Sequence, residues 1–223
     1  MASQPFPSRR RLAGASAGGG RRAAWLGIAA LALAIAPLLP GFWLAPQAAQ
    51  AGGVKEKFAA MGMITFSRRV PAPAFTLPTL TGEVFRLQDL RGKIVFLNFW
   101  ATWCVPCREE MPAMQSLADA FAQRPFAMVA ISQDAAGERV VRPFVEELKL
   151  RFTILLDMDK AVTQRYSVRA LPSTYLIGRD GAVLGIALGP REWNSPQARA
   201  LIEALLELPA AAPSAAPNSE SAN

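Results

Sequence analysis

Short continuous runs of apolar residues recur through the middle of the chain. The runs over 93–100 and 126–132 are rich in β-branched and aromatic side chains, and shorter runs of the same kind cover 152–157, 173–177 and 182–188. An unbroken apolar run of this length is typical of a strand that is buried on both faces. The pattern therefore predicts a central sheet that is covered on both sides.

Segments with helical periodicity separate these runs. Over 105–123 the apolar residues recur every three or four positions, and Pro112 is expected to kink this helix. Further helices are expected over 139–150, 160–166 and 195–208, the last of which begins with Ser-Pro, a common helix start.

Two turn signals complete the pattern. Thr81-Gly82 separates two short apolar stretches and predicts an N-terminal hairpin, and the sequence GRDG over 178–181 predicts a second one. Buried strands that alternate with helices are typical of a mixed α/β domain. We expect this domain to span 71–208, with a parallel core and an antiparallel hairpin at one edge of the sheet.

The N-terminal part of the chain has a different pattern. Residues 1–22 contain five arginines and no acid, and the apolar run that follows has no charged residue. About 20 apolar residues suffice to cross a bilayer, and the basic flank places the N-terminus in the cytoplasm. We expect a basic cytoplasmic segment over 1–22, a transmembrane anchor over 23–45 in a bacterial inner membrane, and the rest of the chain in the periplasm. Alternatively, 23–45 is a signal segment that is cleaved after Ala51, which leaves a soluble periplasmic protein.

Two further segments flank the expected domain. Residues 46–70 are expected to form a linker. Residues 209–223 are expected to form a disordered tail, because they are rich in Ala, Pro and Ser and poor in large apolar side chains. Between Pro71 and Leu208 the chain has fifteen basic and fifteen acidic residues, although the whole chain carries a formal charge of +7. This neutral middle argues against a nucleic-acid-binding surface, which requires clustered cations.

The chain has only two cysteines, Cys104 and Cys107, and no histidine. A structural zinc site usually has four Cys, His or carboxylate ligands, and two thiolates alone do not supply them. A disulfide that closes so short a loop stabilises a fold little, because it removes little entropy from the unfolded chain. The pair is therefore better suited to redox chemistry.

The surroundings of the pair support a redox role. Cys104 lies where a strand gives way to a helix, and the unpaired N–H groups and dipole of a helix N-terminus favour a thiolate. Cys107 follows one turn later on the same face, from which it can attack a mixed disulfide on Cys104. Pro106 restricts the backbone of the first turn. Trp103 is expected to pack against neighbouring residues or to shield the thiol from water.

Two segments, NFWATWCVPCREEMP (98–112) and ALPSTYLIGRDG (170–181), resemble thioredoxin-like proteins. The similarity covers most of 72–208 and is strongest to the membrane-tethered TlpA/ResA-like branch of thiol-disulfide oxidoreductases. It implies an α/β thioredoxin fold with an N-terminal β-hairpin extension and a central helix-strand insertion. It also implies that the Leu171-Pro172 peptide bond is cis and that Pro172 faces the active site. The redox-active disulfide Cys104–Cys107 would then work without a metal or another cofactor.

Two acids, Glu109 and Glu110, follow the cysteines. Both suit the first turns of a helix, where carboxylates complement the dipole. Alternatively, Glu110, on the same helix face as Cys107, tunes the cysteine pair, as the acid at this position does in ResA-like relatives. Asn98 occupies the position of the buried Asp of thioredoxin, and because Asn does not titrate, any proton relay must use another group.

The resemblance implies a periplasmic enzyme that reduces disulfides of client proteins during cytochrome c or copper-oxidase maturation. Such a reductant requires clients with thiol pairs and a transmembrane electron donor of the DsbD/CcdA type. The alternative is a Cu(I)-binding metallochaperone that uses the same cysteines, with Met111 and Met114 either as further soft ligands or as core residues. A peroxiredoxin is a third option, but it requires a Thr where this chain has Ala101.

Overall fold

The computed structural model describes residues 45–209, with side chains from Gly53 onward. The predicted basic N-terminus, the membrane segment up to residue 44 and the tail after Pro209 lie outside these residues. Within 45–209, no helix is both long enough and apolar enough to cross a membrane.

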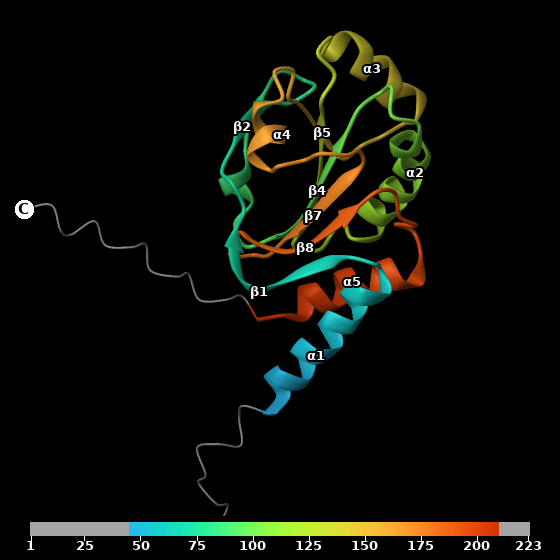
Figure 1. Ribbon diagram of the computed structural model, residues 1–223. Coiled ribbons are helices and arrows are strands. Elements are labelled where there is room, and N and C mark those ends of the chain that lie inside the picture. Colours follow the sequence, from blue (N-terminus) through green and yellow to red (C-terminus); the bar gives the residue numbers. More distant parts are fainter. Residues whose placement is uncertain (1–44, 210–223) are drawn as a thin grey trace, which may run out of the picture. The chain divides into compact units, whose positions relative to one another are not determined.

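A six-stranded sheet forms the centre of the described region (Figure 1). Its strand order is β1-β8-β7-β4-β5-β6; β4, β5 and β6 are parallel, whereas β7, β8 and β1 pair antiparallel to their neighbours. The strands are β1 (Ile64–Pro71), β4 (Ile94–Trp100), β5 (Phe126–Ser132), β6 (Thr153–Leu156), β7 (Ser173–Ile177) and β8 (Ala182–Leu188). The five predicted apolar runs are thus confirmed as strands, and the parallel core is confirmed with them.

Side chains of the central strand β4 alternate between two buried clusters. Phe96 and Trp100 contribute to one cluster, and Leu97 and Phe99 contribute to the other. Every residue of β4 is buried. This burial on both faces explains why the strand is apolar without alternation.

Helices cover the two faces of the sheet. The first cluster includes buried side chains of α2 (Val105–Ala120), α3 (Glu138–Glu147) and α5 (Pro196–Glu207), whereas α4 (Ala161–Arg165) packs in the second. The predicted N-terminal hairpin is confirmed as β2 (Thr76–Pro78) and β3 (Val84–Arg86), which are followed by the short 3-10 helix η1 (Leu87–Leu90). The mixed α/β prediction is therefore confirmed. Strand β4 ends at Trp100 and α2 begins at Val105, so the two cysteines lie where this strand meets this helix.

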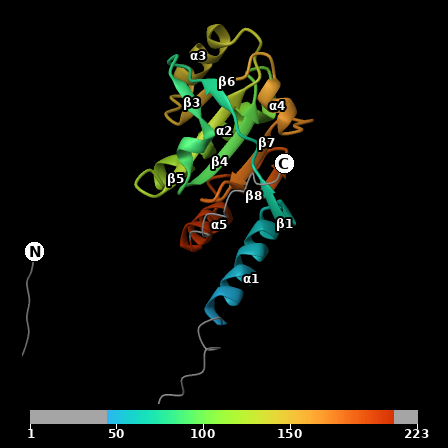
Figure 2. The same cartoon turned by 90° about the vertical axis from the view of Figure 1, so that its left-hand side faces the viewer.

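The structure corrects the prediction of a linker over 46–70. Helix α1 (Ala45–Ala60) and strand β1 occupy most of this segment, and β1 extends the sheet beyond β8 (Figure 2). Most side chains of β1 are exposed, so the strand has no apolar run by which it could be recognised. Because β1 lies outside β8, the β7–β8 hairpin is not at the edge of the sheet, contrary to our expectation.

Helix α1 contacts α5 and leads directly into β1. Its side chain Phe58 is buried and joins the first cluster. A Cβ atom added to Gly185 of β8 would lie 2.5 Å from a ring carbon of Phe58, so this glycine leaves room for the aromatic ring. The N-terminal helix is therefore packed onto the sheet through a close contact.

We expect Gly185→Ala to lower the free energy of unfolding by about 1–3 kcal/mol, because the added methyl group overpacks the contact with Phe58. Gly53→Ala in α1 is the control, since a Cβ there meets no atom within 4 Å and alanine favours a helix by roughly 0.5–1 kcal/mol. Urea unfolding of both variants measures the difference. Equal stability of the two variants would show that packing of the Phe58 ring does not require the space left by Gly185.

Candidate active site

The two cysteines lie at the junction of β4 and α2. Cys104 is the N-cap residue of α2, and the backbone N–H of Cys107 donates to Cys104 Sγ over 3.3 Å. The sulfur atoms form a disulfide, and the two Cα atoms are 5.3 Å apart. The position of Cys104 at the helix N-terminus, which the sequence predicted, is therefore present in the structure.

The two sulfur-bearing residues differ in access to solvent. Cys104 is 6% exposed and lines an open groove, whereas Cys107 is 0% exposed and belongs to the first buried cluster. Trp103 is 65% exposed, so it does not pack in the core. Pro106 lies in the first turn of α2, where its lack of an N–H costs no intrahelical hydrogen bond. An incoming reactant thus meets Cys104 first.

A carboxylate that the sequence analysis did not single out braces the loop before Cys104. Asp134 accepts hydrogen bonds from the backbone N–H and the hydroxyl of Thr102, over 2.9 and 2.7 Å, and from the Ser132 hydroxyl over 2.8 Å. Asp134 follows β5, so the loop after one strand holds the loop after its parallel neighbour. In the sequence, the only feature that could have pointed to Asp134 is its position just after an apolar strand, in Ser-x-Asp.

A groove with a volume of about 570 Å³ connects Cys104 to the loop that precedes β7. It is lined by Trp103–Pro106, Gln133 and residues 168–171. The Leu171-Pro172 peptide bond is cis, as the resemblance implied, and Leu171 shares the groove with Cys104. Among the described residues, the backbone groups of Arg169 and Leu171 make no hydrogen bond. The groove therefore offers unpaired donors and acceptors beside the disulfide.

Glu110 is buried one turn after Cys107 on α2, whereas Glu109 is exposed. Asn98 Nδ2 donates to Glu110 Oε1 over 3.0 Å. The backbone N–H of Arg191 and the indole N–H of Trp193 both donate to Glu110 Oε2, over 3.2 and 3.0 Å. Burial raises the pKa of Glu110 from its ordinary value of 4.5 to about 7, because these hydrogen bonds offset only part of the desolvation.

The sequence analysis predicted Asn98 and Glu110 as separate features, and the structure brings them together. Asn98 also donates to Thr174 Oγ1 of β7 over 3.0 Å, so it links the carboxylate to the sheet. Arg191 and Trp193 were missed, since they follow β8 and no local pattern relates them to α2. Their contacts with Glu110 arise only when the chain folds.

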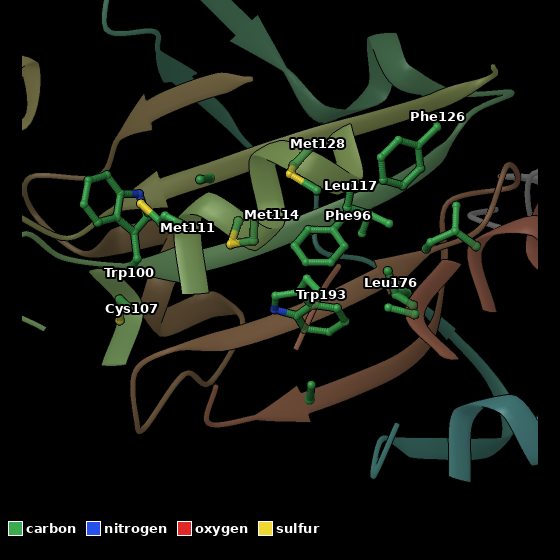
Figure 3. Close-up of a cluster of buried hydrophobic side chains, with 14 of the residues drawn as sticks. Phe96, Trp100, Cys107, Met111, Met114, Leu117, Phe126, Met128, Leu176 and Trp193 are labelled. Atoms are coloured by element: carbon green, nitrogen blue, oxygen red, sulfur yellow. The ribbon is translucent and has the colours of Figure 1, made fainter. Parts of the chain in front are cut away.

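The two methionines of α2 pack in the core. Met111 and Met114 are fully buried, and Figure 3 shows both side chains within the cluster that contains Trp100 and Phe96. Within residues 45–209, no group of three or more His, Cys, Asp and Glu side chains is arranged to hold a metal ion. Core packing thus accounts for both methionines.

In the reduced protein at neutral pH, we expect iodoacetamide to alkylate Cys104 about tenfold faster than Cys107 or more, because Cys104 lies at the helix N-terminus and faces the groove. Mass spectrometry of the labelled peptides measures both rates. Faster labelling of Cys107 would show that the roles are reversed.

The pKa of Glu110 predicts a pH dependence of stability. The folded pKa of about 7 lies above the ordinary 4.5, so this group favours the folded state fully below pH 4.5 and loses that contribution as the pH rises through 7. Glutamine does not ionise. Between pH 4.5 and 8, we therefore expect the oxidised wild-type protein to lose roughly 2–3 kcal/mol of unfolding free energy relative to Glu110→Gln.

Urea unfolding of the oxidised proteins at several pH values measures this difference. Glu109→Gln is the matched control, because its side chain is exposed, and it should follow the wild-type curve. Parallel curves for wild type and Glu110→Gln would mean that folding does not raise the pKa of this carboxyl group.

Comparison with known proteins is consistent with this site. Residues 69–186 match the AhpC/TSA family. The chain is 45% identical over 120 residues to the thioredoxin-like protein YneN of Bacillus subtilis. The matched region covers 53% of this chain and 69% of YneN. The chain is also 37% identical over 130 residues to the thiol-disulfide oxidoreductase ResA of the same organism. That match covers 57% of this chain and 71% of ResA.

A solved structure shows the same architecture. It is a protein described as a DsbE thiol:disulfide interchange protein from Chlorobium tepidum, with a TM-score of 0.58 and 32% identity, and the match covers 64% of this chain and 99% of that one. The described region therefore has a thioredoxin fold. Together with the cysteine pair at the start of α2, these similarities show that the chain belongs to the AhpC/TSA family and, within it, to the ResA-like thiol-disulfide oxidoreductases.

Proposed function

We propose that this thiol-disulfide oxidoreductase acts as a reductant, with Cys104 as the nucleophile and Cys107 as the resolving thiol. The observation that carries the assignment is the difference in placement: Cys104 lines the open groove at a helix N-terminus, and Cys107 is enclosed directly behind it. A nucleophile must reach its substrate, whereas a resolving thiol needs to reach only its neighbour.

The reaction proceeds through a mixed disulfide. The Cys104 thiolate attacks one sulfur of a client disulfide, and the other client sulfur leaves as a thiolate. The Cys107 thiolate then attacks Cys104 Sγ, which releases the second client thiolate and forms the Cys104–Cys107 disulfide. Two electrons pass from the enzyme to the client, and the two client thiolates take up the protons that the enzyme thiols lose.

Client segments bind in an extended conformation along the groove. The unpaired backbone of Arg169 and Leu171 lies beside Cys104 and can pair with such a segment by strand addition. This stretch is fixed at the end of the β7–β8 pair, because the carbonyl of Pro172, just before β7, accepts from the N–H of Gly189, just after β8, over 2.9 Å. Backbone pairing of this kind recognises the shape of the client more than its sequence.

Glu110 exchanges protons with the resolving thiol. It lies one helical turn after Cys107 and is buried, and its pKa of about 7 lets it hold or release a proton near neutral pH. A thiolate that forms on Cys107 beside a neutral Glu110 avoids repulsion between two buried negative charges. Asn98 orients the carboxyl group through its hydrogen bond to Oε1.

The proposed location rests on the N-terminal sequence, and the proposed partners rest on the reducing role. The basic segment over 1–22 and the apolar segment over 23–45 support an inner-membrane anchor with the enzyme domain in the periplasm. A reductant in an oxidising compartment must be reduced again, which calls for a transmembrane donor of the DsbD/CcdA type. Proteins with thiol pairs that mature into cytochrome c or copper oxidase are the proposed clients.

A trapping experiment tests this function. Without the resolving thiol, Cys107→Ser should accumulate mixed disulfides with client proteins in cells, and reduction of purified complexes should release the clients for identification. Cys104→Ser is the control and should trap none, because Cys107 is enclosed. Equal adducts from both variants would contradict the assignment of roles, and adducts limited to oxidants of the periplasm would contradict the reducing direction.

A further inference from the structure

The loop between β8 and α5, residues 189–195, contacts three separate parts of the molecule. The N–H of Gly189 donates to the carbonyl of Pro172 over 2.9 Å. Two residues later, the N–H of Arg191 donates to Glu110 Oε2, and the indole of Trp193 donates to the same oxygen. The loop thus joins the cis-proline segment to the carboxyl group beside the resolving cysteine.

The side chain of Arg191 extends this connection to the N-terminal segment. Its Nε donates to the carbonyl of Met61 over 2.9 Å, and its Nη2 donates to the carbonyl of Gly62 over 3.1 Å. Met61 and Gly62 form the corner between α1 and β1, and Gly62 has a positive φ of 60°. The remaining nitrogen, Nη1, donates to the carbonyls of Leu188 and Pro190 over 3.1 and 2.9 Å.

Within residues 45–209, the guanidinium of Arg191 forms no ion pair with an acidic side chain. Every acceptor of the guanidinium within residues 45–209 is a backbone carbonyl. Carbonyl oxygens fix the position of a guanidinium but do not neutralise it, so its positive charge acts on Glu110. The same side chain therefore anchors the loop and adds to the field at the carboxyl group.

We propose that Arg191 is a positioning residue of the redox site, which fastens the α1–β1 corner to the loop that holds Glu110, so that this corner helps to set the protonation of Glu110. The proposal rests on the assignment of the site to Cys104, Cys107 and Glu110, but not on the reducing direction or on any client. The segment expected to be a linker is then a structural part of the active site.

Few charged or titratable groups face Glu110. From the β8–α5 loop it meets the Arg191 backbone and charge and the neutral Trp193, and from β4 it meets the neutral Asn98. On its own helix, Cys107 is held in the disulfide with Cys104 and does not titrate in the oxidised protein. Loss of the Arg191 guanidinium would remove a positive charge and release the loop that carries two of the three donors. Both changes disfavour the ionised carboxylate.

The first experiment measures the titration of Glu110 directly. Carboxyl ¹³C NMR of the full-length oxidised protein follows the Glu110 signal, which is identified by its loss in Glu110→Gln. We expect Arg191→Met to raise the midpoint by about one pH unit. The matched control is Arg179→Met, because Arg179 also donates to two backbone carbonyls, those of Leu206 and Leu208, at the far end of α5. The control should leave the midpoint unchanged.

The second experiment changes the corner and leaves Arg191 intact. In Gly62→Val, a β-branched residue is forced to a positive φ and its side chain meets the guanidinium, since even a Cβ there lies 3.6 Å from Nη2. Gly82→Val is the control, because Gly82 has a φ of 87° in the β2–β3 hairpin and no atom within 4 Å of an added Cβ. We expect Gly62→Val, and not Gly82→Val, to raise the Glu110 midpoint.

The outcomes separate this inference from the proposed function. If the midpoint of Glu110 is the same in wild type, Arg191→Met and Gly62→Val, the coupling is absent and the inference is wrong, whatever the trapping experiment shows. If Arg191→Met does not fold, Gly62→Val alone decides. A shift of equal size in the two control variants would also overturn it, because general loosening of the fold would then explain the effect.

Discussion

The buried carboxyl group of Glu110 is the constraint on which the arrangement of the site depends. A carboxyl group can remain in an apolar core only if its oxygens are hydrogen-bonded or if it takes up a proton. The fold supplies donors from β4 and from the β8–α5 loop, and burial raises the pKa toward neutrality. Strand, helix and loop must therefore meet at one point, and that point lies beside Cys107.

The cysteine pair depends on a second meeting of elements. Cys104 begins α2 just after the central strand, where the helix N-terminus offers unpaired N–H groups. The loop that carries it is held by Asp134 after the neighbouring parallel strand, and the groove beside it is completed by the segment before β7. Ends of strands on one side of the sheet thus converge on the reactive sulfur, which is accessible, while its partner sulfur is enclosed.

The N-terminal segment moves the start of the enzyme domain toward the N-terminus. Helix α1 and strand β1 pack onto α5 and β8, and their corner is bonded to Arg191 in the loop that holds Glu110. The domain therefore begins before residue 64, and not at residue 71 as the apolar pattern suggested. This segment is thus linked to Glu110 through the hydrogen bonds of Arg191.

The sequence by itself determined the buried strands, the helices between them and the two cysteines at a strand–helix junction, because apolar periodicity reports burial directly. It also indicated Glu110, which shares a helix face with Cys107. Only the tertiary structure decided that β1 is a strand, since its side chains are mostly exposed and its stability comes from pairing with β8. The tertiary structure alone also brought Asn98, Arg191 and Trp193 to Glu110: a hydrogen bond between residues far apart in the chain leaves no periodic pattern, because it forms only when separate elements pack together.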